Sequence, residues 1–207
     1  YITYDHLHTQ NVTRWLGGQG QAAIFPNAKL LVMREEWESS LSLLPWQNQW
    51  YCPNGVQGID ESRIELLDDS VFLGDSSVAL MRTKGHTEGS HSIVANTDQG
   101  LLVTSENGVS MDSYAPIHSK ISGLAAYAKR TQAEVIINGN TLECGNDQYL
   151  SMIQEKEVAG RWPKDERFYN MALSSESDGF HLFPGTTPTV RMGELEFGRL
   201  TLPAAKA

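Results

Sequence analysis

Two closely spaced histidines near the start of the sequence could bind a metal ion. His6 and His8 are separated by one residue, and they follow the strand-like segment 2–4. Residues i and i+2 of an extended chain share a face, so both imidazoles can point at one metal ion. A catalytic zinc or iron site needs about three protein ligands plus an open position. The pair alone is weak evidence, because two surface histidines have the same pattern.

A third histidine and a glutamate strengthen the case for a metal site. His86 lies in the segment 85–90, Gly-His-Thr-Glu-Gly-Ser, directly after an expected strand at 78–83. Glycine permits a tight turn and close backbone approach, which suits a loop that carries an imidazole into a crowded site. Glu106 follows another expected strand, 101–104. Three imidazoles and a carboxylate at strand ends match the ligand set of a catalytic metal site.

The elements that would position these residues are short strands followed by a mixture of helices and strands. Helices are expected at 11–16, 35–44, 121–130 and 147–159. Strands are expected at 28–33, 64–67, 71–73, 78–83, 91–96, 101–104, 134–138 and 189–202. Four of the five strands between 64 and 104 follow one another closely enough to be antiparallel neighbours. This order favours an α/β fold in which helices cover sheets.

The order of these motifs resembles that of the metallo-β-lactamase superfamily. The family has His-x-His after a strand, Gly-His-Thr-x-Gly-Ser about eighty residues on, and an acid at a strand end about twenty further. The segment 25–28, Phe-Pro-Asn-Ala, is similar too, and the resemblance extends from Tyr1 to Glu143. It implies an αββα sandwich, with residues 1–207 as a single domain. It also implies that the N-terminal part of the fold is missing from this chain, so a separate N-terminal polypeptide or a second copy is the expected partner.

The sequence departs from the family at the second metal site. Gln10 and Asn11 stand where the family has Asp and His in its first motif, and Asn140 stands where it has its last metal-binding His. Glu106 aligns with the bridging Asp. Neutral amides are poor ligands for zinc or iron, so only one transition metal ion is expected.

The resemblance therefore implies one zinc or iron ion held by His6, His8, His86 and Glu106. The amides of Gln10, Asn11 and Asn140 would hydrogen-bond to the metal shell or to the substrate. The catalytic base would be Glu106, His118 or the metal hydroxide itself.

The remaining aromatic and histidine residues are less informative. Trp46 and Trp50 lie in a loop, where they either pack in the core or form the wall of an apolar substrate pocket. His118 is a candidate for substrate binding or proton transfer, His91 is expected on a strand surface, and His181 is expected to be structural.

The function implied by the resemblance is metal-dependent hydrolysis of a small ester, lactone, thioester or amide by one metal-activated water. A mononuclear iron oxygenase and a non-catalytic subunit paired with a separate N-terminal chain are the alternatives. Sixteen Lys and Arg against twenty-five Asp and Glu give a net charge of −9, which disfavours nucleic-acid partners. No apolar run is long enough for a membrane span. Cys52 and Cys144 are two free thiols or one disulfide, and the compartment stays open.

Overall fold

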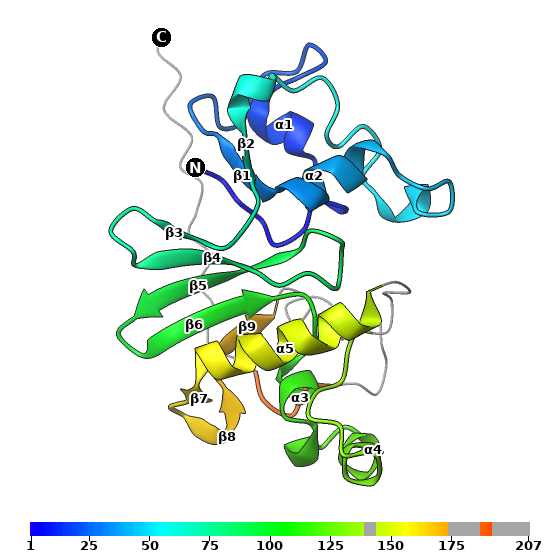
Figure 1. The fold of residues 1–207 in the computed structure, drawn as a ribbon, viewed down its shortest axis with the longest axis vertical. Helices are drawn as coiled ribbons and strands as arrows, with labels where there is room; N and C mark the ends of the chain where they lie inside the picture. The colour runs from blue at the N-terminus through cyan, green and yellow to red at the C-terminus, as the bar shows by residue number, and fades with distance from the viewer. Residues whose placement is uncertain (139–143, 174–186, 192–207) are drawn as a thin grey trace.

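The computed structural model describes residues 1–138, 144–173 and 187–191, and its centre is a five-stranded sheet (Figure 1). The strand order is β3-β4-β5-β6-β9. The first four strands are antiparallel neighbours, as the sequence predicts, and β9 joins parallel to β6. The strand bounds are β3 Val71–Leu73, β4 Val78–Arg82, β5 His91–Thr97, β6 Gly100–Ser105 and β9 Met171–Leu173.

A smaller sheet and two helices lie on one side of the central sheet. Strand β1 (Leu30–Met33) pairs in parallel with β2 (Ile64–Leu67), and Ile2 forms an isolated parallel bridge to Leu30. Helix α1 (Val12–Leu16) precedes β1, and helix α2 (Arg34–Leu41) follows it directly. Two 3-10 turns, η1 (Asn48–Trp50) and η2 (Glu61–Arg63), lie in the connection to β2.

Helices cover the other side of the central sheet. Helix α5 (Gly145–Ala159) runs along it, and α3 (Met111–Tyr114) lies beside α5 (Figure 1). The remaining elements are η3 (Pro116–His118), α4 (Leu124–Thr131), and the hairpin of β7 (Arg161–Trp162) and β8 (Asp165–Tyr169). In the described part of the chain, no helix has the length and apolar character needed to cross a membrane.

The alternation of side chains along the strands builds the layers. Leu30 and Val32 of β1 pack into the cluster that contains α1, whereas Leu31 and Met33 pack against Leu80 of the central sheet. The next residue along β4, Met81, belongs to the cluster on the α5 side. Because successive strand side chains point to opposite faces, each sheet has two buried faces, and the layers follow in the order helix, sheet, sheet, helix.

Most of the expected elements are confirmed, and two expected strands are not. The segment 134–138 is not a strand, and its amides at Ile136 and Asn138 donate to the carbonyl oxygens of Ser113 and Asn107, which belong to α3 and a loop. No strand ladder forms there. The expected strand 189–202 lies mostly outside the described residues, and its described part, 189–191, is not a strand. Strands β7, β8 and β9 were not expected.

Candidate metal centre

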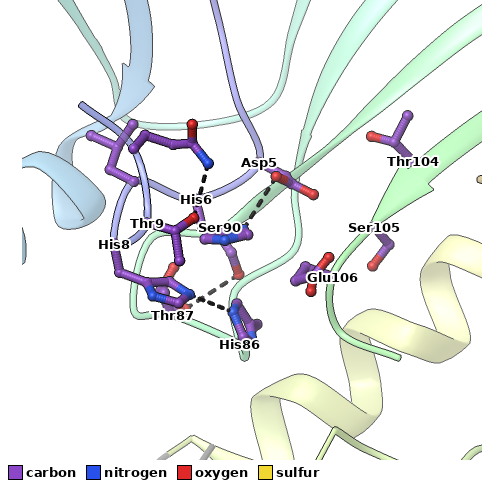
Figure 2. A network of polar contacts seen from close by, with 12 residues as sticks. Asp5, His6, His8, Thr9, His86, Thr87, Ser90, Thr104, Ser105 and Glu106 are labelled. Carbon is purple, nitrogen blue, oxygen red and sulfur yellow. Dashed lines mark hydrogen bonds and ion pairs between the residues drawn. The ribbon is translucent and has the colours of Figure 1, made fainter. Parts of the chain in front are cut away.

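The structure brings His6, His8 and His86 together at the junction of the two sheets. One ring nitrogen of each histidine lies within 4.8 Å of one in both others. His6 and His8 lie in the segment between the Ile2 bridge and α1, and His86 lies in the loop between β4 and β5. The Nε2 atoms of His8 and His86 are 2.9 Å apart, and Figure 2 shows these two rings turned toward each other.

Contacts behind two of the rings determine which nitrogen faces the centre. The Nδ1 atom of His6 is 3.2 Å from a carboxylate oxygen of Asp5, and the Nδ1 atom of His8 is 2.9 Å from the carbonyl oxygen of Trp50. A ring nitrogen beside an acceptor carries the hydrogen, so Nε2 presents its lone pair. Carboxylates and carbonyls in this position orient metal-binding imidazoles in proteins generally.

The protonation states also suit a metal. Burial lowers the pKa of His8 to about 4 and that of His86 to about 3, so both rings are neutral at pH 7. For His6, burial lowers the pKa, but the hydrogen bond and charge of Asp5 raise it more, so His6 keeps a proton most readily of the three. Because neutral imidazole is the metal-binding form, the protonation states of His8 and His86 suit zinc or iron, and an ion would displace any proton that His6 keeps.

Glu106 lies beside the three histidines, but its carboxylate is not part of the group of close donor atoms. It follows the last residue of β6, on the side of His86 away from His8 (Figure 2). Its carboxylate is not among the donor atoms within 4.8 Å of one another, although its charge raises the pKa of His6. Its roles as metal ligand and as base stay predictions.

Comparison with known proteins finds similarity in structure alone. No family profile matches the sequence, and no curated protein matches it. A structure of B. thuringiensis AiiA with N-decanoyl-L-homoserine bound at its active site matches at 19% identity and a TM-score of 0.52. It covers 89% of this chain and 60% of its own. An N-acyl homoserine lactone hydrolase with its product at the catalytic metal centre gives the same values.

A quorum-quenching N-acyl homoserine lactone lactonase also matches at 19% identity with a TM-score of 0.52. This match covers 89% of the present chain and 62% of the lactonase. The chain has the metallo-β-lactamase fold. It spans about 60% of the length of these three structures.

Within this metallo-β-lactamase fold, Gln10 lines the same cavity as His8, whereas Asn11 caps a helix. A cavity of about 440 Å³ is lined by His8, Gln10 and Tyr51 among others. The side chain of Asn11 accepts a hydrogen bond from the backbone amide of Arg14 at 2.9 Å, so it caps α1. A role of Asn11 toward substrate has no geometric support. Asn140 lies outside the described residues.

Neither tryptophan packs in the core. Trp46 is 63% exposed and Trp50 is 64% exposed, so the core-packing interpretation is wrong. Neither residue is among those that line the 440 Å³ cavity. Trp50 contributes its backbone carbonyl to His8, and the ring near His8 is that of Tyr51, with centroids 5.7 Å apart.

His118 lies apart from the clustered histidines, and its role stays a prediction, whereas His91 differs from expectation. His118 is exposed on η3 and lines a separate cavity of about 360 Å³, whose lining contains none of the three clustered histidines. His91 is 1% exposed, because β5 is an interior strand with both faces covered, and a surface position for it is wrong. Its Nε2 lies 2.8 Å from the hydroxyl of Thr3. His181 lies outside the described residues.

Cys52 and Cys144 form no disulfide with each other, so the alternative of a disulfide is wrong. The sequence interpretation missed three residues behind the histidines. Asp5 could have been found, because it directly precedes His6. Glu36 and Asn107 have no local signal, since only the folded chain brings them to the histidine loops.

Proposed function

We propose that this protein is a metal-dependent hydrolase that uses one zinc or iron ion. The convergence of three imidazoles from two separate segments, with their Nδ1 contacts turned outward at His6 and His8, carries this proposal. One ring nitrogen of each histidine faces the same space, and His8 and His86 are neutral at pH 7, which is the form that binds a metal ion.

The cavity beside His8 supports an uncharged substrate. It is lined by Leu7, His8, Gln10, Ser40, Leu43, Asn48, Tyr51, Cys52, Pro53, Asn54, Gly55, Val56 and Gln57, and contains no Asp, Glu, Lys or Arg. A phosphate or carboxylate substrate would find no Lys or Arg side chain there. A small ester, lactone, thioester or amide fits, and lactone hydrolysis is known among proteins of the same fold.

Different residues of the site would hold the ion, accept a proton and bind the substrate during hydrolysis. An ion at this site would polarise the scissile carbonyl and lower the pKa of a bound water toward about 7. His6, His8 and His86 would hold the ion, with Glu106 as a further ligand or as the acceptor of the proton from water. The amide of Gln10 lines the cavity and would hydrogen-bond to the substrate.

The experiment is metal analysis combined with hydrolysis assays on the purified protein. Zinc-loaded protein should hydrolyse neutral lactones or esters, and His86→Ala should lose both the metal and the activity. Iron with turnover that requires O₂ would instead support the oxygenase. A protein that takes up neither metal would support the non-catalytic subunit and refute the proposal.

A further inference from the structure

Glu36 is a fully buried carboxylate that contacts both segments carrying the clustered histidines. It lies in the first turn of α2 and has 0% exposure. Its Oε1 accepts a hydrogen bond from the backbone amide of Leu7 at 2.6 Å, and its Oε2 accepts one from the hydroxyl of Thr87. The backbone amide of Gly89 also donates to it. Leu7 lies between His6 and His8, and Thr87 follows His86.

The packing around Gly89 makes this contact a tight one. A Cβ atom at Gly89 would lie 2.0 Å from the backbone nitrogen of Glu36, so the loop touches the first turn of α2 directly. On the opposite side of the loop, the side chain of Asn107 accepts a hydrogen bond from the backbone amide of His86 at 2.8 Å. The His86 loop is therefore held on both sides, and Glu36 is hydrogen-bonded both to this loop and to the segment that carries His6 and His8.

A carboxyl group buried at this position lowers the stability of the folded state unless its hydrogen bonds are kept. Burial raises the pKa of Glu36, and the hydrogen bonds from Thr87, Leu7 and Gly89 oppose that rise by stabilising the carboxylate. Among the described residues, no Lys or Arg forms an ion pair with Glu36. The donors on the two histidine segments supply these hydrogen bonds, so a displacement of either segment would leave buried carboxyl oxygens with fewer donors.

We propose that Glu36 is a positioning residue that sets the distance between the His6 and His8 pair and His86, and thereby prepares the three imidazoles for a metal ion. This inference rests on the proposed function, because it concerns a metal held by these histidines. Glu36 itself touches no ligand nitrogen and acts through Leu7, Thr87 and Gly89.

The test measures binding of Co²⁺ to the metal-free protein from its visible absorption spectrum. Glu36→Gln keeps the shape but replaces one acceptor oxygen by an NH₂ group, so either Thr87 must reverse its hydrogen bond and accept, or the backbone amide of Leu7 loses its acceptor. The Co²⁺ affinity should fall by roughly 10–100-fold, as for other residues that orient metal ligands, and the absorption bands should shift.

A buried carboxylate elsewhere in the fold provides the matched control. Asp112 has 0% exposure and accepts hydrogen bonds from the hydroxyl of Ser119 and the amide of Thr189, which are remote in sequence from the histidine segments. Asp112→Asn should lower the thermal unfolding temperature but leave the Co²⁺ affinity and spectrum of the folded protein unchanged. An equal loss of affinity in Asp112→Asn and Glu36→Gln would overturn the inference.

A second pair of variants decides the matter if Glu36→Gln does not fold. Thr87→Ser keeps the hydroxyl that donates to Glu36 and should retain the affinity, whereas Thr87→Val removes it and should weaken binding by at least several-fold. Unchanged affinity and spectrum in Thr87→Val, or in a folded Glu36→Gln protein, would also overturn the inference. If the unmodified protein binds no Co²⁺, the proposed function itself fails, which distinguishes the two cases.

Discussion

At the scale of single residues, buried carboxylates organise the surroundings of the histidines. Asp5 faces His6, Glu36 joins the two histidine segments, and Glu155 of α5 holds the amide of Asn107. Glu155 Oε1 is 2.8 Å from Asn107 Nδ2, so the Oδ1 atom of Asn107 must face the backbone amide of His86. The orientation of the His86 loop is thus connected to a helix on the far side of the central sheet.

Glu106→Gln tests whether this carboxylate serves the metal. If Glu106 binds the ion or accepts the proton from its water, the variant should fold normally and lose metal affinity or turnover by roughly 10–100-fold. Metal content by mass spectrometry and the initial hydrolysis rate check this. Full metal content with an unchanged rate would leave only the three histidines in the site.

Glu155 should make the stability of the protein depend on pH. Burial raises its pKa to about 7 from an ordinary value of 4.5, despite hydrogen bonds from Tyr114, Asn107 and Ser92. Between these values the folded state binds more protons than the unfolded state, so the contribution of Glu155 to stability falls as the pH rises from about 4.5 through about 7. The loss is about 3 kcal/mol.

Urea unfolding of the metal-free protein at pH 5 and pH 8 measures this effect. Compared with Glu155→Gln, the unmodified protein should lose about 3 kcal/mol between the two values. Contributions from the buried histidines are common to both proteins and cancel. Glu157→Gln, an exposed change on the same helix, should follow the unmodified protein. A constant difference between the unmodified protein and Glu155→Gln would contradict the prediction.

At the scale of elements, the loop between β4 and β5 is wedged between α2 and α5. Its two glycines make this possible, since an added Cβ at Gly85 would lie 2.4 Å from the Cα atom of Gln148 in α5. The equivalent contact at Gly89 is with the first turn of α2. Both contacts are with backbone atoms, which cannot rotate away as a flexible side chain would. The position of His86 therefore depends on how the two helices pack.

Gly89→Ala should displace this loop. The clash with Glu36 should lower the free energy of unfolding by about 1–3 kcal/mol, the usual range for overpacking, and should weaken metal binding. Gly145→Ala is the control, because its added Cβ would make only an ordinary contact at 3.8 Å with Ile137. Thermal unfolding and Co²⁺ titration of both variants check the prediction, and equal behaviour of the two would refute it.

At the scale of the whole molecule, a bound ion would connect the two sheet layers. His6 and His8 belong to the segment that enters the β1 layer, whereas His86 follows β4 of the central sheet. A ligand that binds only the folded state stabilises it by about 2.7 kcal/mol at one hundred times its dissociation constant. Removing the metal with a chelator should therefore lower the unfolding temperature, and calorimetry with and without zinc checks this. Identical unfolding temperatures would contradict a shared site.

Stoichiometry is the second property of the whole molecule. Gln10 and Asn11 are amides, and amides hold zinc or iron poorly, so about one tightly bound ion per chain is expected. Metal analysis after dialysis against a weak chelator measures it. Two ions that both resist the chelator would refute the single-metal site. The expected partner chain stays a prediction, which light scattering of the purified protein can check.

The sequence by itself determined the strands between 64 and 105, because their alternating side chains and turn residues are local signals. It also determined the three histidines, because their motifs have fixed spacing next to strands. Only the tertiary structure decided which other side chains contact the segments that carry these histidines. Glu36 is close to Leu7 and Thr87 in space but 29 and 51 positions away along the chain, so no local pattern marks it. Burial was decided in the same way: His91 is enclosed and Trp50 exposed because neighbours from distant segments, and not their own types, determine which side chains are covered.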